Sequence, residues 1–315
     1  MKTTKTITLC ALCMLLLGLS GFSVLPAKAQ QLDKPDTIQS FPVKPYPWEM
    51  AFDGENVWVT SINSSEVTKL RATDGTLLGT FHAGGSTFFA AFDGTYVWFT
   101  NLYNDQVTRL RASDGTMAGS FPVGYFPTGI IFDGANMWVA NQYDDTVTKL
   151  RASDGALLGT FNVAGDPIDL AFDGTNIWVT NFDTARVTEL RASDGSLVGV
   201  FDVGAGATGI IFDGANIWVA CDAVNTLFKL RASDGALLGT RGVGSVPRQL
   251  DFDGNNIWVA NSGDDTVMRL REGRGVIKKT YTVESYPVGV LFDGTNIWIA
   301  NSFSNTVSKI SRTAP

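Results

Sequence analysis

The sequence predicts an all-β fold, a seven-bladed β-propeller, because one unit of 40 residues recurs seven times and each copy contains four strand-like segments. The triplet Phe-Asp-Gly returns every 40 residues, and a tryptophan follows six residues after each of its phenylalanines. The triplets begin at Phe52, Phe92, Phe132, Phe172, Phe212, Phe252 and Phe292. Seven copies in phase indicate a repeat architecture in which each unit packs against its neighbours.

The third unit shows how one copy is expected to fold. Segments 128–132, 136–141, 146–152 and 156–163 have the length and composition of strands. Asp-Gly pairs separate the first segment from the second and the third from the fourth, and this dipeptide is typical of tight turns. Four antiparallel strands in so short a unit are typical of one propeller blade. The seven tryptophans are then expected to be buried between neighbouring blades.

The N-terminal part of the chain is expected to close the ring. The last unit ends after its third strand, whereas Ile38 to Val43 matches the fourth-strand pattern of the other units. This segment should therefore complete the last blade and remove an exposed sheet edge.

Residues 1–29 have the features of an export signal. Lys2 and Lys5 precede an apolar stretch, and residues 27–29 form an Ala-x-Ala cleavage pattern. The sequence thus predicts a secreted or periplasmic protein whose mature chain, residues 30–315, is one propeller without a membrane span. An uncleaved anchor over residues 6–26 is the alternative. The mature chain would keep Cys221 as its one cysteine and fold without disulfides.

The charge balance argues against nucleic acid as a partner. The whole chain has a net charge of −7, and residues 1–29 hold three of its 24 basic residues and no acid. Residues 30–315 therefore carry 21 basic and 31 acidic residues, a balance of −10. A surface of that sign repels phosphate backbones.

The segments Trp138-Val-Ala-Asn141 and Trp178-Val-Thr-Asn181, with Thr-Val-Thr and Val-Gly-x-x-Pro-x-Gly patterns, resemble the YVTN-type propeller repeat, with tryptophan in place of its tyrosine. The resemblance covers about residues 37–312. It implies the propeller fold. It leaves the activity open, because YVTN, NHL and streptogramin-lyase-like propellers share one architecture and differ in function.

No catalytic set stands out in the sequence. His82 is the single histidine in the sequence. A metal site with several histidine ligands is therefore excluded. A Ser-His-Asp triad would have to use His82, and nothing else in the sequence supports one. The histidines on which streptogramin lyases depend have no counterpart here. His82 itself is expected at the outer end of a fourth strand, on the surface.

The candidate site is the mouth of the central channel, where the variable loops between units are expected to meet. Just inside the first strand of each unit, the repeat is broken by large or polar residues. The candidate ligand-binding residues are Trp48, Glu49, Phe89, Asp169, Arg248 and Gln249. Two carboxylates and an amide at one mouth could also hold Ca²⁺ through oxygen ligands, and a solvated polar channel is the alternative.

The leading hypothesis for function is an exported, non-catalytic binding or scaffold module that works as a monomer without a cofactor. Aromatic and acidic residues in the variable loops suit a protein, peptide or carbohydrate ligand. The alternative is a propeller enzyme of the lyase or lactone-hydrolase type that uses a divalent cation at the channel mouth.

Overall fold

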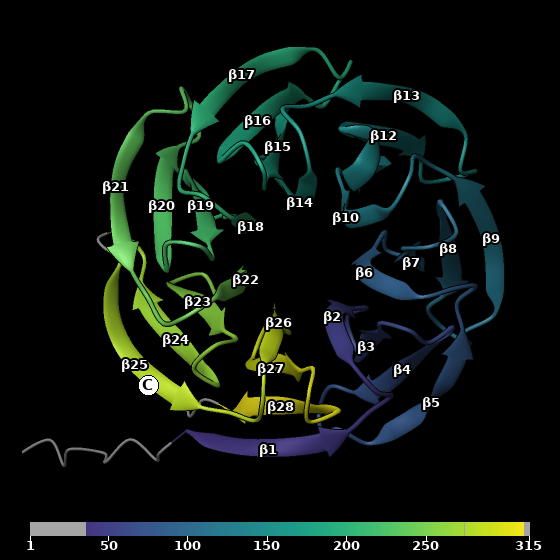
Figure 1. Ribbon diagram of the computed structural model, residues 1–315. Helices are drawn as coiled ribbons and strands as arrows, with labels where there is room; N and C mark the ends of the chain where they lie inside the picture. Colours follow the sequence, from purple (N-terminus) through teal and green to yellow (C-terminus); the bar gives the residue numbers. More distant parts are fainter. Residues whose placement is uncertain (1–35, 274, 312–315) are drawn as a thin grey trace, which may run out of the picture. The chain divides into compact units, whose positions relative to one another are not determined.

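The computed structural model describes residues 36–273 and 275–311, which form 28 β-strands and one 3-10 helix, η1 (Gln142–Asp144). The strands are grouped in seven antiparallel four-stranded sheets, the blades, around a central axis (Figure 1). The predicted seven-bladed β-propeller is therefore confirmed.

Each class of strand occupies the same place in every blade. The innermost strands are β2 (Pro47–Phe52), β6 (Thr87–Phe92), β10 (Pro127–Phe132), β14 (Pro167–Phe172), β18 (Ala207–Phe212), β22 (Pro247–Phe252) and β26 (Pro287–Phe292). The second strands are β3 (Asn56–Ser61), β7 (Tyr96–Asn101), β11 (Asn136–Asn141), β15 (Asn176–Asn181), β19 (Asn216–Cys221), β23 (Asn256–Asn261) and β27 (Asn296–Asn301).

The third strands are β4 (Glu66–Arg71), β8 (Gln106–Arg111), β12 (Thr146–Arg151), β16 (Arg186–Arg191), β20 (Thr226–Arg231), β24 (Thr266–Arg271) and β28 (Thr306–Ser311). The outermost strands are β5 (Leu77–His82), β9 (Met117–Pro122), β13 (Leu157–Asn162), β17 (Leu197–Asp202), β21 (Leu237–Gly242), β25 (Val276–Thr282) and β1 (Thr37–Pro42). Blades one to six each consist of four consecutive strands, and blade seven consists of β26, β27, β28 and β1.

The aspartate of each Phe-Asp-Gly triplet organises the turn between the first and second strands. In blade one, Asp53 Oδ1 accepts hydrogen bonds from the backbone N–H groups of Glu55 (3.0 Å) and Asn56 (2.6 Å). Its Oδ2 accepts the indole Nε1–H of Trp58 at 2.8 Å. The same Trp-to-Asp bond recurs in all seven blades. One carboxylate thus sets both the turn and the orientation of the buried indole.

The seven tryptophans of the repeat form the core between blades, and none of these seven has more than 2% of its surface exposed. Trp298 of blade seven, for example, packs with Met50, Val57 and Leu70 of blade one. Neighbouring blades cover both faces of the second strands, which explains why those strands are apolar on both sides. Replacing one of these tryptophans by alanine is expected to cost about 3–5 kcal/mol.

In most blades, a lysine or arginine of the third strand donates hydrogen bonds to backbone carbonyl groups of the next blade. Lys149 Nζ donates to the carbonyl oxygens of Ala192 (2.7 Å) and Ser193 (3.1 Å), and it lies 4.9 Å from the ring centroid of Trp138. We call this arrangement the interblade clasp. Equivalent hydrogen bonds are made by Lys69, Arg109, Lys229 and Lys309. Hydrogen bonds of a charged group contribute about 1.5–3 kcal/mol each.

The N-terminal strand closes the ring, as predicted. β1 pairs antiparallel with β28 from Thr37 opposite Ser311 to Pro42 opposite Thr306. In Figure 1 it lies outside β28 at the edge of blade seven. Phe41 packs on Trp298, with ring centroids 5.8 Å apart, and against Gly75 in the next blade's turn.

Across the described residues, no helix has the length and apolar character needed to cross a membrane. The predicted export signal, residues 1–29, lies outside the described residues, and so does its predicted cleavage site.

Candidate functional site

Every innermost strand carries a β-bulge near its start. In β2, the pairing with β3 shifts register between Pro47 and Met50, which leaves Trp48 and Glu49 out of the ladder. The backbone N–H of Glu49 donates instead to Thr60 Oγ1 at 2.9 Å. The other six innermost strands have the same shift. Bulges re-aim side chains, and here they turn consecutive residues of one strand toward the channel.

The second residue of each bulge belongs to a ring around the channel, which we call the bulge ring. Its members are Glu49, Phe89, Gly129, Asp169, Gly209, Gln249 and Gly289. A Cβ on Gly289 would lie 2.5 Å from the carbonyl oxygen of Trp48 and 3.3 Å from Glu49 Oε1, and the other two glycines approach the next blade as closely. Each glycine thus makes room for a larger neighbour. A ring of seven cannot alternate throughout, so Glu49 and Phe89 are adjacent large residues.

A pocket of about 220 Å³ opens at the mouth of the channel, on the face that carries the variable loops. Trp48 stacks on Phe88 with ring centroids 5.0 Å apart, and Phe88 meets Phe89 edge-on, also at 5.0 Å. Arg248 and Gln249 of β22 add polar groups to this aromatic wall. We call it the mouth pocket. It is completed by Gln142, Asp166, Ile168, Phe182, Thr208 and Val288.

Arg248 is held at the wall of the mouth pocket by two partners. Its Nη1 lies 3.2 Å from Asp222 Oδ2, and its Nη2 donates to the Tyr286 hydroxyl at 3.3 Å. Its Nε is buried and has no hydrogen-bond partner. Burial raises the pKa of Asp222, and the guanidinium opposes that rise. The arginine therefore keeps one buried donor unpaired while Asp222 balances its charge.

The channel continues on the other side of the bulge ring as a cavity of about 450 Å³, which we call the inner cavity. Phe89 and Gln249 line both this cavity and the mouth pocket. Glu49, Asp169 and Asp251 are the acidic residues that line it, and no Lys, Arg or His does so among the residues that the structure describes.

Burial raises the pKa of all three inner carboxyls. The pKa of Glu49 stands well above its ordinary value, first through burial and then through the charges of Asp169 and Asp251. Burial raises the pKa of Asp169 to about 7, against the hydrogen bonds that it accepts from two backbone N–H groups and from Gln249. Burial likewise raises the pKa of Asp251 to about 6. Asp169 and Asp251 can therefore gain or lose protons near neutral pH.

The six candidate residues fall into two overlapping groups. Trp48, Phe89, Arg248 and Gln249 line the mouth pocket, whereas Glu49 and Asp169 lie deeper and line the inner cavity with Phe89 and Gln249. Among the residues that line these cavities, Asp251 is an acidic group that the sequence analysis does not name. Asp251 could have been found by comparison of the units, because the other six units have an apolar residue there: Ala51, Ala91, Ile131, Ala171, Ile211 and Leu291.

Metal-binding and nucleophilic side chains are sparse in residues 36–273 and 275–311. Within these ranges, no three His, Cys, Asp or Glu side chains come close enough together to hold a metal ion. His82 is exposed at the end of β5. Cys221 is a buried free thiol, and burial raises its pKa to about 12, so it is a weak nucleophile at neutral pH.

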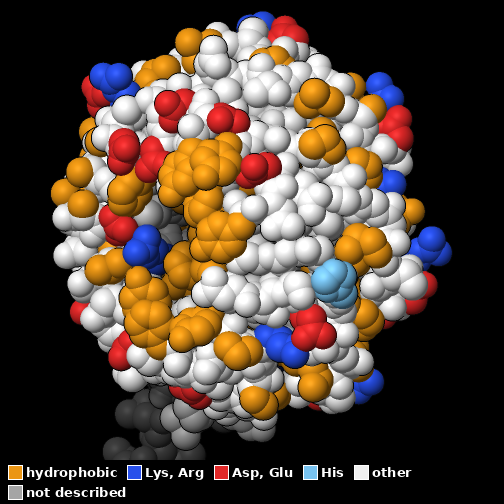
Figure 2. Space-filling model, turned by 45° about the vertical axis from the view of Figure 1, so that its right-hand side comes forward, with side chains coloured by type: hydrophobic (Ala, Val, Ile, Leu, Met, Phe, Trp, Pro, Cys, Tyr) orange, Lys and Arg blue, Asp and Glu red, His pale blue; other side chains and the backbone are white. Residues whose placement is uncertain are grey.

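Aromatic side chains surround the mouth pocket on the loops. Phe126 stacks on Tyr143 with centroids 4.6 Å apart, and Tyr286 stacks on Phe303 at 4.2 Å. Tyr46, Phe126 and Tyr286 adopt φ values of 55°, 57° and 58°, a conformation that bulky residues rarely adopt and that concentrates at functional sites. Figure 2 shows hydrophobic side chains gathered in a band beside a hollow, with acidic side chains along it.

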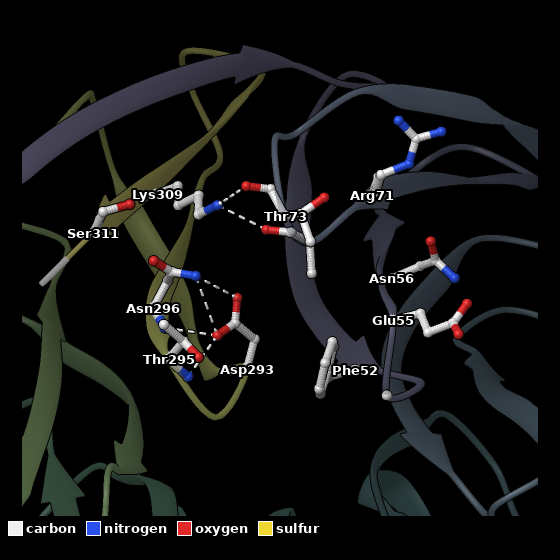
Figure 3. A pocket seen from close by; sticks show the side chains of 12 residues that line it. Phe52, Glu55, Asn56, Arg71, Thr73, Asp293, Thr295, Asn296, Lys309 and Ser311 are labelled. Carbon is white, nitrogen blue, oxygen red and sulfur yellow. Dashed lines mark hydrogen bonds between the residues drawn. The ribbon is translucent and has the colours of Figure 1, made fainter.

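A larger hollow lies on the opposite face, between blades seven and one, and has a volume of about 720 Å³. There, Lys309 makes an interblade clasp with the carbonyl oxygens of Ala72 and Thr73, and Asp293 is bonded to Asn296 (Figure 3). Similar grooves of about 660 and 520 Å³ lie between blades one and two and between blades two and three. They follow from the repeat, and Lys309, Lys69 and Arg151 in them already have partners within the fold, so we assign them a structural role.

The chain matches no protein-family model and no curated protein. Among solved structures, it is similar to one titled "Streptogramin B lyase structure", with a TM-score of 0.76 and 17% identity over 88% of this chain and 98% of that one. It is also similar to Kuenenia stuttgartiensis hydrazine synthase, with a TM-score of 0.77 and 16% identity over 92% of this chain and 99% of that one. At this identity the likeness shows the propeller fold alone, the fold that the YVTN resemblance implied.

Proposed function

We propose that this protein is an exported binding module that holds one group of its ligand in the mouth pocket. The observation that carries the proposal is the aromatic wall of Trp48, Phe88 and Phe89 facing Arg248, whose Nε is buried without a partner. Aromatic residues and arginine are the types that most often dominate binding energy. They converge here from different blades, on the face where the repeat is least uniform.

The size of the mouth pocket indicates how much of the ligand it encloses. Pockets that enclose a whole small molecule usually measure about 300–1,000 Å³. At about 220 Å³, the mouth pocket suits a single side chain or ring. The rest of a peptide, protein or carbohydrate would then lie on the exposed aromatic loops, such as those of Tyr103 and Tyr143. Stacking on such rings adds about 0.5–1.5 kcal/mol per contact.

Binding by matched variants tests the proposal. A ligand is first isolated by pull-down with the purified protein, and its affinity is then measured for Trp48→Ala and Arg248→Ala. Both side chains are partly exposed, so the variants should fold, and each should lose about 2 kcal/mol or more of binding free energy. Asp154→Ala, in an exposed turn of the opposite face, is the control and should keep full affinity. Loss of affinity in the control but not at the mouth would place binding on the other face.

Export is tested by the mass of the protein after expression with its N-terminus intact. The Ala27-Lys28-Ala29 pattern predicts a mature chain that begins at Gln30. An intact mass that includes Met1 to Ala29 in a membrane fraction would contradict it.

A second candidate function is an enzyme of the lyase or lactone-hydrolase type that uses the channel and a divalent cation. It is favoured by the raised pKa values of Glu49 and Asp169, since perturbed carboxyls concentrate at catalytic sites. One structural relative is titled a lyase. Metal analysis of the purified protein and thermal unfolding with and without CaCl₂ separate the candidates. If the parent protein contains a metal ion that the Glu49→Gln variant lacks, the enzyme is favoured. If the protein contains no metal and CaCl₂ leaves its Tm unchanged, the binding module is favoured.

A further inference from the structure

The second carboxylate oxygen of Glu49 is an unused group at the centre of the molecule. Glu49 is 8% exposed, and its Oε1 accepts the backbone N–H of Met50 at 3.0 Å. Its Oε2 is buried and has no hydrogen-bond partner, and Glu49 as a residue lines the inner cavity. An unpaired buried polar atom has a free-energy cost in the folded protein, and the cost is greater when the atom is charged. A ligand atom that reaches Oε2 would recover that cost.

The charges around Glu49 specify the sign of such a ligand. The strands packed against β2 are β3, β6, β26 and β27, and none of them carries an ionisable side chain. The acidic groups that act on Glu49 across the channel are Asp169 and Asp251. Asp251 lies two residues further along β22 than Gln249 of the bulge ring, so the carboxyls occupy two successive levels. The inner cavity is therefore a region of negative potential.

The entrance to this region suits an organic cation better than a metal ion. Both oxygens of Asp169 already accept backbone N–H groups, from Leu170 at 2.8 Å and Ile210 at 3.2 Å. A bare ion would thus find few free ligands. The route from outside passes Trp48 and Phe89, whose rings attract cations and also pack against apolar stems.

We propose that the channel binds an alkylammonium group, with its apolar stem against Trp48, Phe88 and Phe89 and its ammonium nitrogen at Glu49 Oε2, opposite Asp169. This inference deepens the proposed binding function and rests on it. The stem would fill the mouth pocket, and the head would pass the bulge ring beside Gln249. Arg248 does not oppose entry, because its charge is balanced by Asp222. The same chemistry belongs to a free amine and to a lysine side chain of a partner.

Calorimetric titration at pH 8 with three probes tests the site. n-Butylammonium should bind, and 1-butanol, which has the same stem and no charge, should bind at least tenfold more weakly. CaCl₂ should neither bind nor displace butylammonium. Two short peptides distinguish the sources: one has a single lysine, and its twin has norleucine at that place. A lysine peptide that binds more tightly than butylammonium points to a protein partner, and the reverse order points to a free amine.

Variants assign the binding to Glu49 rather than to general acidity. Glu49→Gln and Asp169→Asn should each weaken butylammonium binding at least tenfold. Glu189→Gln is the matched control, because Glu189 is also a buried carboxyl with a raised pKa but lies outside both cavities. It should bind butylammonium as the parent protein does. Bound cation should also expel protons from the inner carboxyls, so the apparent enthalpy near pH 7 should differ between phosphate and Tris buffers.

Three results would overturn the inference. Equal affinity for butylammonium and 1-butanol would show that the positive charge of the ligand does not contribute to binding. Tighter binding of Ca²⁺, with loss in Glu49→Gln, would make the channel a metal site. Equal losses in Glu49→Gln and Glu189→Gln would indicate a nonspecific effect of charge. None of these results bears on the pull-down with Trp48→Ala, so failure of the amine site and failure of the proposed binding function remain distinct.

Discussion

Glu189 of β16 lies beside Asp173, at the position where the other six blades have a lysine or arginine. Glu189 is 4% exposed, and Asn176 Nδ2 donates to its Oε1 at 2.7 Å. Burial and then the charge of Asp173 raise the pKa of Glu189 to about 7. Blade four therefore places an acid where its neighbours place the cation of the interblade clasp.

Restoring the cation should stabilise the ring. In Glu189→Lys, the ammonium should reach the carbonyl oxygen of Ala232, as Lys149 reaches that of Ala192. We expect about 1–3 kcal/mol of added stability at pH 8, measured by denaturant unfolding. Glu189→Gln, which removes the charge without making a clasp, should gain less. The reverse change, Lys149→Glu, should destabilise the protein, and a Glu189→Lys variant no more stable than its parent would contradict the clasp.

The pH dependence of stability should follow the raised carboxyls. A carboxyl with a higher pKa in the folded state binds its proton more tightly there, so its contribution is full below its ordinary pKa and is lost as pH rises through the raised value. For Asp251, Asp169 and Glu189 that window runs from about pH 4 to about pH 7. The Tm at pH 5 should exceed the Tm at pH 8 by at least about 5 °C.

Two checks accompany that profile. The double variant Asp169→Asn, Glu189→Gln should flatten the decline between pH 5 and pH 8. Below pH 4, stability should fall again: burial raises the pKa of Asp133, but hydrogen bonds from Trp138 and Asn136 outweigh it and hold the pKa below its ordinary value. A profile that rises steadily from pH 5 to pH 8 would show that the inner carboxyls are not buried as described.

The bulge ring should tolerate no side chain at its glycines. A Cβ on Gly209 would lie 2.7 Å from Gln249 Oε1 and 3.0 Å from Gln249 Cα. We expect Gly209→Ala to cost about 1–3 kcal/mol, measured by thermal unfolding. Gly242, at the end of β21, has nothing within 4 Å of its missing Cβ and no positive φ. Gly242→Ala is the control and should be neutral or slightly stabilising. Equal losses in both variants would rule out crowding as the cause.

The sequence predicted the blades and their closure because those features repeat. The Phe-Asp-Gly triplet predicts a turn, and the tryptophan six residues after its phenylalanine predicts a buried ring. Because both recur seven times in phase, the number of blades and their boundaries are well defined. Glu49 and Asp169 were found in the same way, as breaks in a repeat. The sequence could not show that a bulge turns both Trp48 and Glu49 toward the channel, because a bulge is a property of pairing between strands.

For the same reason, the sequence predicts a single site at the channel mouth, whereas the structure has two separate levels. Glu49 and Trp48 are neighbours in the chain, yet one lines the inner cavity and the other the mouth pocket. The arrangement of Arg248 and Asp222 was also beyond the sequence. Their side chains come from blades six and five, and only the ring geometry brings them to 3.2 Å.

Closure by β1 gives the last prediction. Loss of residues 30–43 should remove Phe41 from Trp298 and leave β28 as an unpaired edge. Phe41 and Val43 would each lose about 1.5–3 kcal/mol of burial, and the open edge should promote association between chains. Chains that begin at Gln30 and at Lys44 are compared by thermal unfolding and size-exclusion chromatography. The longer chain should be monomeric, and the shorter one should melt at a lower temperature and self-associate. If both chains melt within a few degrees of each other and stay monomeric, pairing of β1 with β28 does not stabilise the closed ring.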